Sequence, residues 1–197
     1  MTYNNQFPGP TIRVNRGDLL RLNFINNLPD TNAYNILGYK RNMTNLHTHG
    51  WHVSPDEPAD NVLLHLNPGD SYNYEYDTAL QEAGTLSFYH PHVHGLVAEQ
   101  MWAGLSGALV VEDESSLLDD YETHILVLKD ISLLGSKPEP YSSSGDYTCG
   151  KQGDIIMVNG QVNPRLYVRR GQVQRWRIVN ASNTRFYRLF LEDHSLN

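Results

Sequence analysis

Two short histidine-rich runs hold the residues of this sequence that are best suited to chemistry. Residues 45–51, Asn-Leu-His-Thr-His-Gly-Trp, carry two histidines, and residues 88–95, Phe-Tyr-His-Pro-His-Val-His-Gly, carry three. Because alternate residues of a strand point to the same face, each run predicts one row of imidazoles where it is extended. Neutral imidazole is the commonest metal ligand in proteins and suits copper, zinc, iron and nickel. On neighbouring strands, the two runs would form one metal site from His47, His49, His90 and His92, with His94 as a further candidate.

The elements that must position these runs are short strands joined by turns that contain Gly and Pro. Before residue 120, strands are expected at residues 11–15, 19–25, 71–76 and 104–111, and one short helix at 96–104. After it, strands are expected at 124–128, 155–158, 173–179 and 185–191, with a long loop over 135–153. Many strands with hardly any helix indicate an all-β fold, either a sandwich or a barrel.

The later part of the chain repeats the beginning of the earlier part. Residues 159–180 carry Asn, Pro, Arg-Gly and alternating apolar residues in the same order as residues 5–26. Such a repeat indicates two copies of one β domain, which we expect to span residues 1–116 and 117–197. The second copy has no counterpart of the strands that follow residue 30, so we expect it to be incomplete alone and completed by something else.

Composition and charge argue against several classes of function. The formal net charge of -7 argues against general binding to nucleic acid or to an anionic membrane. Seven arginines between Arg165 and Arg188, with no acid among them, indicate a solvated face, or one that meets an acidic neighbour, rather than an anion site. No run of 18 apolar residues predicts a membrane span. Cys149 is the only cysteine, which excludes an internal disulfide, and the first residues show no signal-peptide pattern from which to infer a compartment.

The histidine runs and their flanks resemble the N-terminal part of multicopper oxidases of the laccase type. Residues 46–50 (Leu-His-Thr-His-Gly) and 88–92 (Phe-Tyr-His-Pro-His) resemble the first two copper motifs of that family. Residues 7–14 (Phe-Pro-Gly-Pro-Thr-Ile-Arg-Val) resemble the opening of its first cupredoxin domain, 104–111 the strand that closes it, and 159–183 the start of its second domain. The resemblance covers nearly the whole chain. It implies a cupredoxin-like Greek-key β-sandwich or barrel, followed by an incomplete second cupredoxin-like domain.

The resemblance also implies roles for individual residues. In that family, eight histidines hold a trinuclear copper cluster that reduces dioxygen to water. By resemblance, His47 is a ligand of the type 2 copper, His49 and His90 bind one copper of the type 3 pair, and His92 binds the other. The family uses no third histidine at the place of His94, which stays a candidate from strand alternation alone. Asp60 stands where the family often has an acid near the cluster, which implies a proton relay.

The electron-entry site of the family is not found in this sequence. That site is a type 1 copper held by Cys, two His and usually Met, and Cys149 has no adjacent histidine. The other four cluster histidines are absent as well. The resemblance therefore predicts the N-terminal portion of an oxidase that acts on phenolic or similar small reducing substrates, inactive as an isolated chain. Its implied partners are dioxygen and the remainder of the oxidase polypeptide or other copies of this chain, and its implied location is periplasmic or secreted.

Three other interpretations stay open at this point. The chain is alternatively a copper-binding cupredoxin module without turnover, or a small oxidase whose site forms between several copies. A zinc hydrolase is a weaker alternative, because such sites need only three protein ligands and an open position for water.

Overall fold

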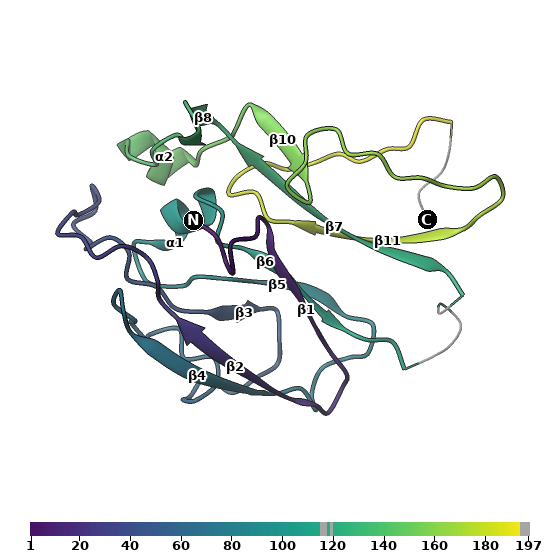
Figure 1. Cartoon of the computed structure of the whole chain (residues 1–197), viewed down its shortest axis with the longest axis horizontal. Helices are drawn as coiled ribbons and strands as arrows, with labels where there is room; N and C mark the ends of the chain where they lie inside the picture. The colour runs from purple at the N-terminus through teal and green to yellow at the C-terminus, as the bar shows by residue number, and fades with distance from the viewer. Residues whose placement is uncertain (115–117, 119, 194–197) are drawn as a thin grey trace.

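Figure 1 shows a computed structural model of the chain, which describes residues 1–114, 118 and 120–193. We call residues 1–114 the first unit and residues 120–193 the second unit. Three sheets are stacked in layers, and the middle one has the strand order β1-β6-β5-β3. Its strands are β1 (Gly9–Val14), β6 (Gly107–Val111), β5 (Leu86–His90) and β3 (His47–His49).

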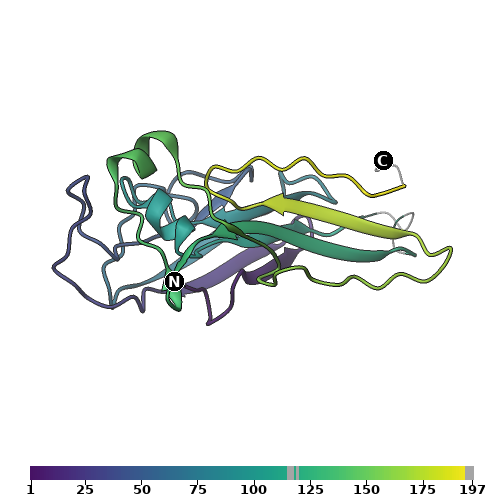
Figure 2. The same cartoon turned by 90° about the horizontal axis from the view of Figure 1, so that it is seen from above.

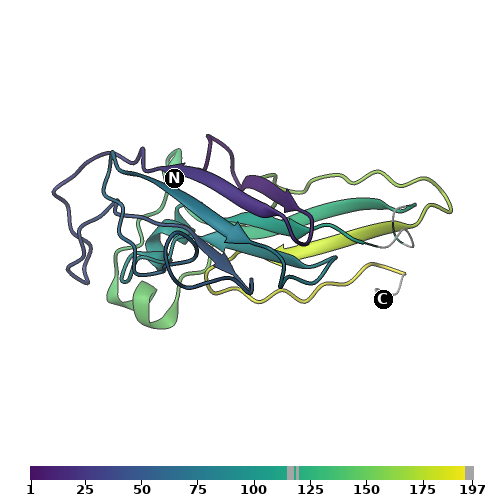
Figure 3. The ribbon, with the colours of Figure 1, turned by 90° about the horizontal axis from the view of Figure 1, so that it is seen from below.

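The two outer layers come from different parts of the chain. On one side of the middle sheet lies an antiparallel pair, β2 (Leu19–Ile25) and β4 (Ser71–Asp77), which Figure 3 shows nearest the viewer. On the other side lies the sheet of the second unit, seen from above in Figure 2. Its order is β10 (Ile155–Val158), β7 (Glu122–Ile131) and β11 (Gln174–Asn180).

Strand β6 explains why the middle sheet can be covered on both faces. Its sequence Gly-Ala-Leu-Val-Val is apolar throughout, and all five residues are buried. Leu109 and Val111 belong to the core shared with the β2–β4 pair. Ala108 belongs to a second core with Val127 and Val179 of the second unit. A strand buried on both faces has a continuous apolar sequence in place of an alternating one.

The remaining elements are short. Helix α1 (Val97–Trp102) follows β5, and α2 (Ser144–Cys149) follows the small hairpin of β8 (Leu133–Leu134) and β9 (Lys137–Pro138). Trp102 packs against Tyr141 and Met157, so α1 rests on the second unit. Neither α1 nor α2 is long and apolar enough to cross a membrane, and the described residues contain no other α-helix.

The all-β prediction is confirmed, and the sheets form an open layered sandwich rather than a closed barrel. β2 has the bounds that the sequence predicted, and α1 lies within the expected helix. Two expectations were wrong. The loop expected over 135–153 contains β9 and α2, and α2 starts at a capping box in which Ser143 and Asp146 bond reciprocally.

The second wrong expectation is the strand at 185–191, where the structure has no named strand. The alternation is present in the sequence, but Phe186 and Phe190 are 96% and 82% exposed, and none of the named strands among the described residues pairs with this segment. A strand needs a hydrogen-bonded partner as well as a pattern. The expected domain boundary at 116/117 falls on residues 115–117, which lie outside the described residues, so the division of the chain into two domains stays a prediction.

Candidate metal centre

The pairing of β3 with β5 brings the two histidine runs together. The strands are antiparallel, and their register places His47 directly opposite His90 and His49 opposite Phe88. Directly opposed side chains and their diagonal neighbours share one face of the sheet. One ligand nitrogen from each of His47, His49 and His90 therefore lies within 4.8 Å of the others. No other group of three potential metal ligands meets this limit among the described residues.

Asp60 fixes the orientation of the His47 ring. Nδ1 of His47 lies 2.7 Å from a carboxylate oxygen of Asp60, which is 8% exposed. The second carboxylate oxygen accepts a hydrogen bond from the backbone N–H of Thr48 at 3.1 Å. With its Nδ1–H donated to the carboxylate, His47 keeps the lone pair of Nε2 for a metal, in the arrangement that carboxylates commonly give to metal-binding histidines.

His49 and His90 point ring nitrogens at each other. Nδ1 of His90 lies 2.8 Å from the carbonyl oxygen of Pro91 and donates to it, which leaves Nε2 unprotonated. That Nε2 lies 3.2 Å from Nδ1 of His49. The His49 ring is held on its other side by Phe88, which stacks on it with ring centroids 4.5 Å apart. Two nitrogens aimed at one small volume from adjacent strands can hold one cation between them.

His92 lies beside the clustered histidines, whereas His94 does not. The centroid of the His92 ring lies 4.9 Å from that of His47, so His92 joins the group although it follows the end of β5. His94 is exposed and its ring packs edge-on against Tyr39, with ring centroids 5.4 Å apart. The alternation that predicted His94 on the ligand face fails because the strand ends at His90 and the chain turns after His92.

Burial and the neighbouring rings disfavour the charged forms of His49 and His90. Burial lowers the pKa of His90 to about 4, and burial followed by the neighbouring His47 and His92 rings lowers the pKa of His49. Neutral rings offer free lone pairs, which is the state that binds metals. A donor set made of imidazoles, with a carboxylate outside it, suits copper or zinc better than calcium or magnesium.

Other polar residues around the site were missed at the level of sequence. Asn45, Thr44 and Gln100 are buried, and Gln100 bonds to the hydroxyl of Thr44 and to the carbonyl oxygen of Met43. The available signal in the sequence was the polar pair Thr44 and Asn45 shortly before the His-Thr-His motif of residues 47–49. These residues hold the segment that leads into β3.

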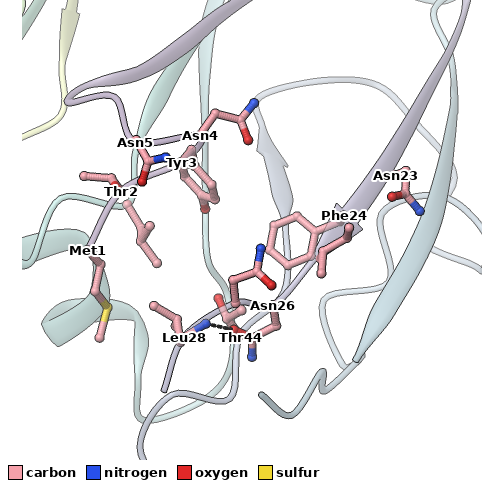
Figure 4. A pocket seen from close by; sticks show the side chains of 13 residues that line it. Met1, Thr2, Tyr3, Asn4, Asn5, Asn23, Phe24, Asn26, Leu28 and Thr44 are labelled. Carbon is pink, nitrogen blue, oxygen red and sulfur yellow. Dashed lines mark hydrogen bonds between the residues drawn. The ribbon is translucent and has the colours of Figure 1, made fainter. Parts of the chain in front are cut away.

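Two further features lie apart from the histidines. Cys149 is exposed at the end of α2, with no histidine beside it. A surface cavity of about 420 Å³, shown in Figure 4, is lined by residues 1–5 and 23–28 together with Thr44 and Leu105, and it includes none of the clustered histidines.

The fold and the site together define a layered β-sandwich protein with a cluster of histidines that could hold a metal ion, and comparison with known proteins gives the family. Residues 1–116 match the family described as multicopper oxidase. The chain belongs to this family. It is 30% identical over 198 residues to the multicopper oxidase mco of Staphylococcus aureus, covering 98% of this chain and 40% of that protein. It is 31% identical to the laccase of Bacillus subtilis, covering 97% of this chain and 43% of the laccase.

A solved structure supports the same assignment. The multicopper oxidase from Pseudomonas thermotolerans superposes with a TM-score of 0.74 at 30% identity, over 93% of this chain and 41% of that one. The cupredoxin-like fold class is thereby confirmed. The chain spans about two fifths of the length of these relatives. A protein named cell division protein FtsP, from Gallibacterium anatis, is 32% identical over 97% of this chain and 38% of its own length, so family relatives carry more than one functional name.

Proposed function

We propose that this chain supplies half of the ligands of the trinuclear copper cluster in a laccase-like oxidase. The oxidase would take electrons from phenolic or similar small reducing substrates and reduce dioxygen to water. One observation carries the proposal: Nδ1 of His49 and Nε2 of His90 lie 3.2 Å apart, beside a His47 ring that a carboxylate orients. Copper bound at these nitrogens would supply the electron transfer and the dioxygen binding that this reaction requires.

The individual assignments follow the same geometry. His47, whose Nε2 is left free by its bond to Asp60, is proposed as the type 2 ligand. His49 and His90, which face each other, are proposed to share one copper of the type 3 pair. His92 is proposed to serve the other, and its ring lies nearer to that of His47 than to that of His90, at 4.9 Å against 6.1 Å. His94 is left out of this proposal because its ring packs on Tyr39.

Asp60 is proposed to handle protons as well as to orient His47. Four protons must reach each dioxygen that becomes two waters, so a protein group that accepts and releases protons beside the cluster would have a direct use. The Asp60 carboxylate is 8% exposed and lies against His47 Nδ1 and the Thr48 amide. These contacts hold the carboxylate at the edge of the site, where it can pass protons inward from solvent.

The complete oxidase needs ligands that this sequence does not contain. Cys149 is the only cysteine, and it lies exposed in α2 without an adjacent histidine. The type 1 copper and the second set of cluster histidines are therefore proposed to come from the remainder of the oxidase polypeptide or from other copies of this chain. The chain alone is proposed to be inactive in turnover.

The same observation favours a second candidate function, a copper-binding module without turnover. A chain with half of the cluster ligands and no type 1 site would bind copper with incomplete coordination. One similar protein is named a cell division protein and not an oxidase. The two candidates make the same prediction for copper binding and different ones for oxygen consumption.

The test combines copper titration with oxygen uptake on the chain and two single variants. His49→Ala removes an exposed ring that faces His90, and the matched control His94→Ala removes an exposed ring from outside the group. We expect His49→Ala to weaken copper binding at least about tenfold, and His94→Ala to change it less than about twofold. Equal copper affinity in all three proteins would overturn the site.

Oxygen uptake then decides between the two functions. With a phenol as reductant, the oxidase proposal predicts uptake only when a polypeptide carrying the type 1 and remaining cluster ligands, or further copies, associate with the chain. The mass of the active species in solution identifies which of these is present. Copper bound without uptake in any assembly would favour the module, and no copper bound would refute both.

A further inference from the structure

Asn45 is a fully buried side chain that ties three separate segments together at the metal centre. Its Oδ1 accepts a hydrogen bond from the backbone N–H of His92 at 2.6 Å. Its Nδ2 donates both hydrogens, to the carbonyl oxygens of Val62 and Leu64, at 3.0 Å each. All of these partners are backbone atoms, so the side chain acts as a clamp on the main chain.

The clamp stands where the β3–β5 ladder stops. The last paired residues of that ladder are His47 and His90. Pro91 follows and has no N–H to donate, so the backbone pairing cannot continue through it. Extending the register by two residues would place Asn45 opposite His92. The side-chain amide of Asn45 therefore replaces the backbone ladder at the first amide after the proline.

His92 depends on this clamp more than the other histidines of the group do. The ring of His47 is bonded to Asp60, and the rings of His49 and His90 face each other, with His90 also bonded to Pro91. Among the described residues, no hydrogen bond holds the ring of His92, which lies beside the rings of His47 and His90. The position of that ring is consequently set by its backbone.

The clamp also connects His92 with His47 through the loop after Asp60. Val62 and Leu64 lie two and four residues beyond Asp60, whose carboxylate holds the His47 ring and the Thr48 amide. Asn45 itself lies two residues before His47 in the chain. The loop, the strand and the second histidine run are thus fixed to one another, and the rings of His47 and His92 are held at 4.9 Å.

We propose that Asn45 is a positioning residue that holds the His92 ring beside the His47 ring and so sets the spacing between these two ligands. The role in metal binding rests on the proposed function, because it takes His92 as a copper ligand, whereas the clamp itself is a property of the metal-free chain. Outer partners of this kind typically change metal affinity by about 10- to 100-fold when they are removed.

Asn26 provides a matched control within the same unit. It is 1% exposed, and its Nδ2 donates to the carbonyl oxygens of Asn42 and Leu66 at 2.8 and 2.9 Å. Its Oδ1 accepts from the backbone N–H of Leu28 at 3.0 Å, the dashed line in Figure 4. Asn26 therefore makes the same three kinds of bond as Asn45, at similar burial, and none of these bonds is to a histidine.

The experiment measures amide hydrogen exchange of the metal-free chain by NMR and then copper affinity by titration. In the wild type, we expect the His92 amide to exchange at least about 100-fold more slowly than the amide of exposed His94. Asn45→Ala should remove most of this protection and weaken copper binding 10- to 100-fold. Asn26→Ala should raise exchange at Leu28 and change copper affinity less than about twofold.

The two measurements separate failure of this proposal from failure of the proposed function. Exchange of His92 as fast as His94 in the wild type would overturn the clamp without any variant, even where Asn45→Ala does not fold. Copper affinity that is equal in Asn45→Ala and wild type, with His92 loosened, would overturn the positioning role while leaving the copper site intact. A wild type that binds no copper would refute the proposed function, and the exchange rates would still decide the role of Asn45.

Discussion

Buried polar side chains serve different ends in the first and second units. In the first unit, Asp60 and Asn45 bond to the ring of His47 and to the backbone of His92. In the second unit, Asp130 bonds to Arg185 and to the Gly153 amide, and the described residues of this unit form no group of potential metal ligands. Polar burial alone therefore does not mark a site in this protein. Convergence of ligand atoms on one volume does.

The two units also use the same sequence pattern differently. The repeat relates β2 to β11, yet β2 pairs antiparallel with β4 whereas β11 pairs parallel with β7. β1 has residues 165–168 as its counterpart, and these form no strand in the structure. Tyr167 and Val168 there are 81% and 62% exposed. The comparison teaches that an alternating pattern becomes a strand only where another strand is available to pair with it.

Arg185→Ala tests whether the buried polar group of the second unit is purely structural. Nε of Arg185 lies 3.0 Å from the carboxylate of Asp130, which is fully buried. Removing the guanidinium leaves a buried carboxylate with only the Gly153 amide on that oxygen. We expect a loss of up to about 3 kcal/mol in the free energy of unfolding, because the carboxylate is buried while the Arg185 side chain is 25% exposed. Denaturant unfolding measures it.

Arg188→Ala is the matched control, because Arg188 is exposed and lies three residues further along the same segment. We expect it to change stability by less than about 0.5 kcal/mol. Copper affinity should be unchanged in both variants where they are folded, since neither side chain contacts the histidine group. Weaker copper binding by folded Arg185→Ala would show that the buried polar groups of the second unit also affect the histidine group.

Lys129 gives a second test of the second unit through pH. Its ammonium is buried and donates to the carbonyl oxygen of Ala181 and to Asn183. Burial lowers the pKa of Lys129 to about 8, against 10.5 for an ordinary lysine. Between these values the unfolded chain binds the proton more strongly than the folded one, so stability rises with pH across this window and falls as pH drops through the folded pKa.

We expect the free energy of unfolding to gain up to about 2 kcal/mol from pH 7.5 to pH 9.5 through this group. Lys129→Met keeps the apolar stem and removes the titration, so its stability should lack that rise. Buried tyrosines, whose pKa is raised in the folded chain, oppose this trend towards pH 9.5 in both proteins, so the quantity that reports Lys129 is the difference in slope between wild type and Lys129→Met. An identical slope in wild type and Lys129→Met would show that Lys129 titrates normally.

Much of the site was predictable because its determinants are local. Strand alternation placed His47 and His49 on one face, and the register then required only that the two runs pair. The core strands were predictable for the same reason, since Ser71–Asp77 alternates and Gly107–Val111 is apolar throughout. Short-range periodicity carries this information directly.

The rest depended on partners far away in the sequence. Pro91 was a local signal that the ladder would stop after His90, but the packing of the His94 ring on Tyr39, which lies far away in the sequence, was not predictable. The bond from Asn45 to His92 spans 47 positions, and only the folded register reveals it. The alternating segment at 185–191 forms no named strand, and none of the sheets in the described part of the chain includes it. Tertiary pairing decides such cases.

Two stacked tyrosines of β4 allow a bonded and an unbonded buried hydroxyl to be compared within the first unit. Tyr74 and Tyr76 are both fully buried, with parallel rings and centroids 5.6 Å apart. The hydroxyl of Tyr74 accepts a hydrogen bond at 3.0 Å from the backbone N–H of Leu46, the residue before His47. The hydroxyl of Tyr76 is buried with no hydrogen-bond partner among the described residues. The Tyr74 hydroxyl therefore recovers part of its desolvation cost through a hydrogen bond, whereas the Tyr76 hydroxyl does not.

Replacing each tyrosine with phenylalanine should give opposite results. Tyr74→Phe leaves the Leu46 amide unpaired and should cost about 1–2 kcal/mol, because an unsatisfied buried donor carries its full desolvation penalty. Tyr76→Phe removes a hydroxyl that gains nothing from burial, so it should be neutral or stabilising by up to about 1 kcal/mol. Thermal unfolding of both variants measures the difference. Equal losses would mean that the Tyr76 hydroxyl has a hydrogen-bond partner, such as a buried water. In that case the polar groups in the core of the first unit would be as fully hydrogen-bonded as Asp60 and Asn45 beside the histidines.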